Sequence, residues 1–189
     1  MYHGANRRHE AVCVLIGLIS DTHIPESAPD IWPQVYEAFE RVDLILHAGD
    51  LHVLDVVDRL ERLAPIYVAR GNGDDGGAGR PVVPEDPRLR ESWVLDLEGF
   101  KVGMTHAFEF PEWPPYRTFD KMLDYAFGGR VDIVVCGHTH VTMLENYKGV
   151  LIVNPGSPMF PRNMNTSLGN IGFLELARGR ARAWIEQLV

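Results

Sequence analysis

Histidine and carboxylate side chains recur directly after short apolar runs of this sequence. Residues 136–140 read CGHTH and follow the apolar run VDIVV at 131–135. His138 and His140 are separated by one residue, so along an extended chain both imidazoles point to the same side. Gly137 lets the backbone turn sharply at this point. Taken alone, the pair is as compatible with two polar loop histidines as with a metal site.

Four further polar clusters follow predicted strands in the same way. They are Asp21-Thr22-His23, Gly49-Asp50, Gly71-Asn72-Gly73-Asp74 and Thr105-His106. Each cluster is a weak signal, but five in order, most beside a glycine, are hard to explain as turn residues. Together they offer two carboxylates, one amide oxygen and four imidazoles: Asp21, His23, Asp50, Asn72, His106, His138 and His140.

The chemical types of these seven side chains indicate which ions they would bind. A set without thiolates suits Mn, Fe, Zn, Co or Ni rather than a structural cysteine–zinc site. Seven ligands are more than one tetrahedral ion uses. They suit two ions that share a bridging carboxylate and keep positions open for water and substrate.

The elements that carry these clusters alternate in type through the first half of the chain. Apolar, β-branched runs at 12–20, 43–49 and 65–71 predict strands. Proline at a first helical position predicts a helix at 33–42, and three- and four-residue apolar spacing predicts another at 53–63. This alternation favours a mainly parallel sheet covered by helices.

The second half adds strands and one helix. A Gly/Pro-rich loop at 71–87 precedes a hairpin at 92–106 that turns at Glu98-Gly99, a helix at 117–127, strands within 131–135 and 142–154, and a final hairpin at 172–188. We therefore expect two packed sheets flanked by helices, with the polar clusters at strand ends, where open α/β sheets bind their ligands.

Composition limits the class of protein. The 189 residues predict a single domain at 11–189 behind a disordered extension at 1–10. A net charge of −8 disfavours binding to long nucleic acids. Two cysteines without a CxxC pair favour a reducing cytoplasm. We expect no membrane partner, because no apolar run approaches the ~20 residues of a membrane span.

As a set, the motifs DTH, GD, GN-x-D, a later lone histidine and GHTH resemble those of the calcineurin-like metallophosphoesterases. The resemblance is greatest to their small single-domain phosphodiesterases. It runs from about Ile16 to the C-terminus and includes NPGS at 154–157. It implies an α/β fold, a four-layer αββα sandwich, around a dinuclear metal centre.

The resemblance also implies a role for each of the seven side chains. Asp21, His23 and His140 would hold one ion, Asn72, His106 and His138 the other, and Asp50 would bridge them. A metal-bridging hydroxide would attack phosphorus in line, which makes Asp50, Asn72 and His106 the catalytic set. The cofactors would be two divalent transition-metal ions, with Mn favoured over Ni, Co, Fe or Zn. The partner would be a small phosphoester, and a homo-oligomer is compatible.

Gly73 departs from the family pattern. It stands where many family phosphatases carry a histidine that can protonate the leaving group. Without that acid, we expect phosphodiesters with acidic leaving groups to be cleaved better than phosphomonoesters. Histidine installed at position 73 is expected to raise monoesterase activity, provided that the local geometry permits it.

Other polar and aromatic residues are open to two readings. His47 is a hydrogen-bonding support of the site or a core histidine, and His52 is expected to be exposed near the start of the second helix. Asn154 and Ser157 shape a turn, with a lesser chance of touching substrate, and Arg162 is expected to be solvated. Trp113 and Tyr116 either stack a base or, as we favour, cover the core.

Two other functions are compatible with the fold. The retromer subunit that shares it is a protein-interaction scaffold without catalysis, but its relatives tend to lose metal ligands, and this chain keeps all seven. A DNA nuclease would need capping domains that the 189 residues do not contain. We therefore expect a metal-dependent phosphodiesterase, with a non-catalytic scaffold as the alternative.

Overall fold

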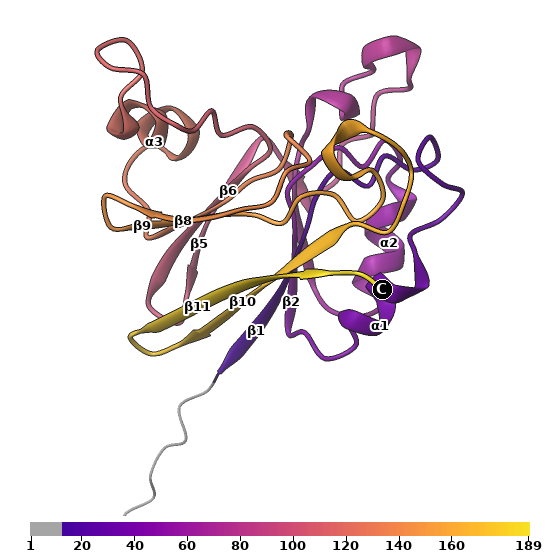
Figure 1. The fold of residues 1–189 in the computed structure, drawn as a ribbon, viewed down its shortest axis with the longest axis horizontal. Helices are drawn as coiled ribbons and strands as arrows, with labels where there is room; N and C mark the ends of the chain where they lie inside the picture. The colour runs from indigo at the N-terminus through magenta and orange to yellow at the C-terminus, as the bar shows by residue number, and fades with distance from the viewer. Residues whose placement is uncertain (1–12) are drawn as a thin grey trace, which may run out of the picture.

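The computed structural model describes residues 13–189. Its two sheets pack against each other, and helices cover their outer faces (Figure 1). The expected disordered extension at 1–10 lies outside the described residues. Among those described, no helix is long and apolar enough to cross a membrane.

The first sheet has six strands in the order β11-β10-β1-β2-β3-β4. Their bounds are β1 Val14–Ile19, β2 Leu44–His47, β3 Ile66–Ala69, β4 Leu89–Arg90, β10 Asn170–Ala177 and β11 Arg180–Gln187. Strands β1 to β4 run parallel, as the alternation of strands and helices predicted, whereas β10 is antiparallel to β1. The sheet is therefore mixed.

The second sheet has five strands in the order β5-β6-β7-β9-β8. Their bounds are β5 Ser92–Leu97, β6 Phe100–Thr105, β7 Ile133–Val135, β8 Met143–Tyr147 and β9 Val150–Asn154. Strands β6, β7 and β9 are parallel, and β5 and β8 are antiparallel edges. The hairpin turn between β5 and β6 lies where it was predicted, with positive φ angles at Glu98 (49°) and Gly99 (85°), as a type I′ turn requires.

The helices complete four layers. Figure 1 shows α1 (Pro33–Ala38) and α2 (Asp55–Glu61) beside the six-stranded sheet, and α3 (Phe119–Phe127) beside the other sheet. Short 3-10 segments cover Asn72–Asp74, Gly77–Gly79 and Pro161–Asn163. Three buried apolar clusters separate the layers: one under α1 and α2, one between the sheets and one under α3. The predicted αββα sandwich is confirmed.

The first two helices are shorter than the sequence pattern predicts. The pattern at 33–42 contains a helix only to Ala38, although Phe39 and Val42 remain buried in the turn that follows. Burial of apolar side chains, which the pattern reports, does not require helical backbone at each of them. The loop at 71–87 was located correctly.

Candidate metal centre

The polar clusters gather at one edge of the sandwich. Asp21 and His23 follow β1, Asp50 follows β2 and Asn72 follows β3, whereas His106 follows β6, and His138 and His140 follow β7. These strands are parallel within each sheet, so their carboxyl ends meet at the same edge. The contacts below show that the structure brings all seven predicted side chains together.

Left-handed backbone shapes three of the loops that carry them. Positive φ angles occur at Asp21 (56°), His23 (51°), Asp50 (57°), His52 (70°), His138 (70°) and His140 (56°). Such angles are uncommon outside glycine and cluster at functional sites. The expectation that an extended chain aims His138 and His140 to one side is therefore wrong in detail. The chain bends at both residues, and the His138 ring contacts His106 whereas the His140 ring contacts Asp21.

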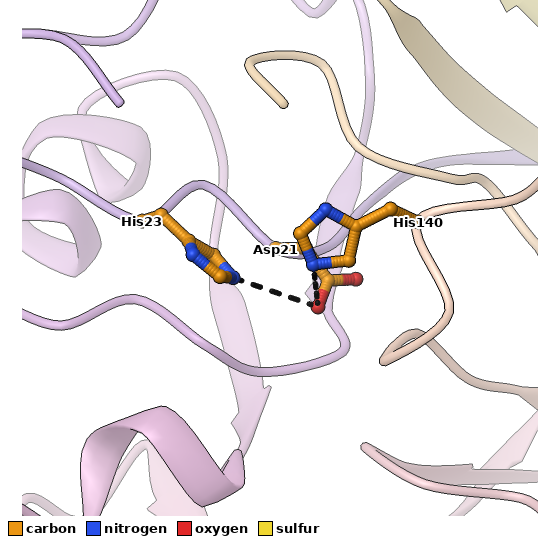
Figure 2. Close-up of side chains that lie close together, drawn as sticks. All are labelled: Asp21, His23 and His140. Carbon is orange, nitrogen blue, oxygen red and sulfur yellow. Dashed lines mark ion pairs between the residues drawn. The ribbon is translucent and has the colours of Figure 1, made fainter. Parts of the chain in front are cut away.

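The first group of side chains is Asp21, His23 and His140, drawn in Figure 2. The Nε2 atoms of His140 and His23 lie 3.3 and 3.9 Å from Oδ1 of Asp21. The other nitrogen of His140, Nδ1, is 2.7 Å from the carbonyl oxygen of Phe160 and donates to it. Because Nδ1 donates to Phe160, Nε2 is the nitrogen of His140 that is available to an ion.

Electrostatics shows how strongly this group attracts positive charge. Burial opposes ionisation of Asp21, yet the His140 and His23 rings hold the pKa of its carboxyl below the ordinary value. Burial likewise disfavours a charged His23, but Asp21 and Asp50 raise its pKa to about 9. Protons therefore bind where a cation would otherwise neutralise the carboxylates.

The second group surrounds Nε2 of His106. This atom lies 3.1 Å from Oδ1 of Asn72 and 3.2 Å from Nδ1 of His138. The other nitrogen of His106 is 2.7 Å from the carbonyl oxygen of Ala48 and donates to it, which again leaves Nε2 free for the group. His106 is buried, whereas Asn72 and His138 are exposed.

Asp50 lies between the two groups. Its Oδ2 is 3.3 Å from Nε2 of His23, and its Oδ1 is 3.5 Å from Nε2 of His106. The backbone N–H of Gly73 donates to Oδ1 at 2.7 Å. One carboxylate thus faces an imidazole of each group.

Gly137 was expected to permit a sharp backbone turn, but the structure requires glycine there for another reason. Its φ is not among the positive values. A Cβ atom at this position would lie 1.8 Å from Oγ of Ser20 and 2.8 Å from Oδ2 of Asp21. Glycine is required here because the loop after β7 approaches the end of β1 closely, and the backbone N–H of His138 donates to the Asp21 carboxylate at 3.0 Å.

Several buried polar residues hold the loops in place. Ser157 donates to the carbonyl oxygen of Asp21 at 2.7 Å, and Asn154 donates to that of Gly137 at 2.7 Å. Both side chains are buried, so they are supports of the site rather than substrate contacts. His47 is buried and hydrogen-bonded, as both of its readings require. Its Nδ1 accepts from the N–H of Gly49, and its Nε2 lies 3.2 Å from Oγ1 of Thr22.

His52 is the residue that sequence reasoning misjudged. It was expected to be exposed, but it is only 3% exposed and belongs to the site. Its ring centroid lies 4.2 Å from that of His23, and its Nδ1 is 2.8 Å from Oε2 of Glu26. Asp74 was likewise overlooked as a support: its carboxylate accepts from the backbone N–H groups of Asp50 and His52, while burial raises its pKa. A signal for His52 was present, because His52 follows Asp50 by two residues, as His23 follows Asp21.

Aromatic residues outside the centre also depart from expectation. Trp113 and Tyr116 are 67% and 78% exposed, so the reading that they cover the core is wrong. Tyr116 instead lines a surface pocket with Arg117 and Lys121, next to Ala107, the residue that follows His106. Arg162 is exposed, as expected, although its backbone N–H donates to the carbonyl oxygen of His140.

The donor set fits divalent metal ions. Asp21, His23 and His140 offer ligand atoms within 4.8 Å of one another, as do Asp21, Asp50 and His106. Nε2 of His23 is buried without a hydrogen-bond partner. A buried imidazole nitrogen without a partner is costly unless an ion or proton reaches it.

Comparisons with known proteins agree with this chemistry. The model of the calcineurin-like phosphoesterase superfamily domain matches residues 14–177. A probable metallophosphoesterase of Methanothermobacter thermautotrophicus is 38% identical over 155 residues, which are 82% of this chain and 83% of that protein. Phosphodiesterase MJ0936 of Methanocaldococcus jannaschii is 28% identical over 149 residues, 75% of this chain and 82% of that protein.

The fold is also found among solved structures. Vacuolar protein sorting 29 from Cryptosporidium parvum superposes with a TM-score of 0.69 at 19% identity, covering 93% of this chain and 98% of that one. At this identity the likeness establishes the fold alone.

Proposed function

Because the chain belongs to the calcineurin-like phosphoesterase superfamily, we propose that it is a dinuclear metal-dependent phosphodiesterase acting on small phosphoesters. The placement of Asp50 carries this proposal. Its two carboxylate oxygens face different imidazoles, His23 at 3.3 Å and His106 at 3.5 Å. This is the arrangement that a carboxylate shared by two ions requires.

The residue roles proposed from the geometry are those that the resemblance implied. Asp21, His23 and His140 would bind one ion, Asn72, His106 and His138 the other, and Asp50 both. The bound ions supply Lewis acidity at phosphoryl oxygens and lower the pKa of water. The protein's own contribution is to fix the imidazole nitrogens: Nδ1 of His106 donates to Ala48, and Nδ1 of His140 to Phe160.

The proposed preference for diesters follows from the absence of a proton-donating side chain at position 73, beside Asp50. Gly73 offers no side chain to protonate a leaving group, and the polar atom nearest its Cβ direction is Nε2 of His52. A diester with an acidic leaving group needs no such proton and carries one negative charge rather than two. Histidine installed at position 73 is no longer expected to raise monoesterase activity, because its Cβ would collide with His52 at 2.5 Å.

The test is the ratio of kcat/KM for bis-nitrophenyl and mono-nitrophenyl phosphate, both measured with Mn. We expect the diester to be favoured and both activities to vanish after chelation and to return with added metal. A ratio well below one contradicts the diesterase proposal, and activity that survives chelation contradicts metal dependence. Replacing Mn in turn by Ni, Co, Fe and Zn tests our preference for Mn.

Two subsidiary proposals concern the cellular setting and the assembly. The exposed Cys13 and the buried Cys136 are both free, which suits a reducing cytoplasm. A homo-oligomer is compatible with the proposed activity, and light scattering of the purified protein would test it. A non-catalytic scaffold like the retromer subunit remains the second candidate because of the vacuolar protein sorting 29 fold. Absence of hydrolysis with every metal would favour it.

A further inference from the structure

His52 contributes an imidazole to the site that no motif assigned. We propose that His52 is an additional ligand of the metal centre, coordinating through Nε2 the ion that His23 and Asp50 face. The inference deepens the proposed function, because it concerns the same centre. Four structural observations carry it.

The first observation is the hydrogen bond between Nδ1 of His52 and Glu26, which anchors the ring. Nδ1 of His52 lies 2.8 Å from Oε2 of Glu26, and since a carboxylate only accepts, Nδ1 carries the hydrogen. The lone pair is then on Nε2. A carboxylate that accepts from the outer nitrogen is the partner that metal-bound histidines commonly have, and it makes the ring a stronger ligand.

The second observation is that Nε2, the other ring nitrogen of His52, has no partner. Nε2 of His52 is buried and has no hydrogen-bond partner, and the whole residue is 3% exposed. Leaving a polar atom buried without a partner is unfavourable. The ring centroid of His23 lies 4.2 Å from that of His52, and its Nε2 also lacks a hydrogen bond, although Oδ2 of Asp50 lies 3.3 Å from it. One cation would satisfy both nitrogens.

The third observation is the composition of the surroundings. His23, Asp50 and His52 each offer a ligand atom, and these atoms lie within 4.8 Å of one another. Two imidazole nitrogens and a carboxylate form a donor set that suits a divalent transition metal. The Asp50 carboxylate also provides the negative charge that favours a cation there.

The fourth observation is the backbone. Asp21 and His23, Asp50 and His52, and His138 and His140 form three pairs, each separated by one residue and each left-handed at both members (φ from 51° to 70°). In the other two pairs, both members belong to the proposed ligand set. The backbone of His52 is bent in the same way as theirs, which directs its ring to the same centre.

This role explains why residue 73 is glycine. A Cβ at Gly73 would lie 2.5 Å from Nε2 of His52. Any larger residue would push the imidazole out of the position from which it coordinates. The absence of a side chain at position 73 therefore leaves room for His52 to act as a ligand.

The experiment measures metal binding rather than turnover. Co(II) is titrated into the metal-free protein and into H52A, E26A and E37A, with visible absorption and calorimetry as readouts. Glu26 is exposed, so E26A removes the anchor without opening the core. Glu37 is an exposed glutamate of α1 that forms no ion pair within residues 13–189 and serves as the matched control.

We expect H52A to weaken binding of one Co(II) ion by more than about a hundredfold and to shift the d–d bands. E26A should weaken the same ion about ten- to a hundredfold, as loss of such an anchor does elsewhere, and E37A should match wild type. Thermal melts of the metal-free variants show whether the fold is retained. E26A keeps the test valid if H52A is unstable.

Two results would overturn the proposal. Wild-type affinity and absorption in both H52A and E26A would exclude coordination, and a fall in kcat/KM with unchanged Co(II) binding would make His52 a substrate contact instead. Failure of the proposed function is separable. If wild type binds two ions but hydrolyses no phosphoester, loss of one ion in H52A still supports coordination by His52.

Discussion

The two sheets contribute different chemistry to the candidate metal centre. Of the seven predicted side chains, the six-stranded sheet delivers both carboxylates, the amide and His23, and the proposed ligand His52 follows a strand of the same sheet, whereas the five-stranded sheet delivers histidines only. Each candidate ion group nevertheless combines both sheets: His140 faces Asp21, and His106 faces Asn72. The predicted ligands of each ion therefore come from both sheets. The packing of one sheet against the other sets the ligand distances.

The two ion groups also differ in their access to solvent. Asp21 and His140 are 0% and 4% exposed, whereas Asn72 and His138 are exposed. A closed group holds its ligands rigidly, and an open group leaves room for substrate. The comparison therefore suggests a tightly held ion beside Asp21 and a more exchangeable ion beside Asn72.

The largest effect is expected from the residue that both groups share. Asp50→Asn keeps the shape but removes the charge, and it should lower kcat for bis-nitrophenyl phosphate by more than about a thousandfold. Loss of one preorganised electrostatic contact already costs about 10²–10³, and Asp50 faces both groups. Near-normal turnover, with a normal thermal melt, would rule out a shared carboxylate.

The next prediction separates the two groups. His140→Ala and His138→Ala should each lose mainly one ion, measured by metal analysis after gel filtration. The buried His140 should be needed for the ion that survives dialysis, and the exposed His138 for the ion that exchanges. Full occupancy in both variants would show that the assignment to separate ions is wrong.

A third prediction tests the contact between the sheets. Gly137→Ala places a Cβ 1.8 Å from Oγ of Ser20, so the loop after β7 must move away from the end of β1. Overpacking of this kind costs about 1–3 kcal/mol, and we expect a lower Tm and weaker metal binding.

The matched control for this variant is the double substitution Ser20→Ala with Gly137→Ala. Removing the hydroxyl relieves the shortest contact and should restore part of the Tm. If Gly137→Ala alone retained wild-type stability and metal content, the close approach of the two sheets would not be needed for the site.

The smallest effect concerns His47, which lies behind the loops of the six-stranded sheet. Burial lowers its pKa to about 3, whereas the unfolded chain titrates near 6.5. Between these values the unfolded state binds a proton that the folded state does not. The free energy of unfolding therefore falls as the pH decreases from about 6.5 towards 3, by at most about 1.4 kcal/mol per pH unit.

Denaturant unfolding of wild type and His47→Gln from pH 7 to pH 4 measures this contribution. The difference in unfolding free energy between the two proteins should shrink as the pH falls, because only wild type carries the buried imidazole. A difference that is independent of pH would mean that His47 is protonated equally in both states.

Much of this protein could be derived from its sequence, because the relevant signals are local. Apolar, β-branched runs located β1, β2 and β3, and Glu98-Gly99 marked a turn where the structure has one. The seven ligand candidates were visible because polar residues that end buried strands are conspicuous. The four-layer fold followed from the resemblance that these motifs carry.

Only the tertiary structure decided how those residues meet. His52 shares the two-residue spacing of the other pairs, but its burial was not predicted, because its surroundings include Glu26 and Gly73, which lie 26 residues before it and 21 residues after it in the chain. Gly137 looked like a turn residue, but the neighbour that requires it is Ser20 on the other sheet. Spacing along the chain reports which side chains share a loop. Distances between loops depend on the packing of the two sheets, which no local pattern encodes.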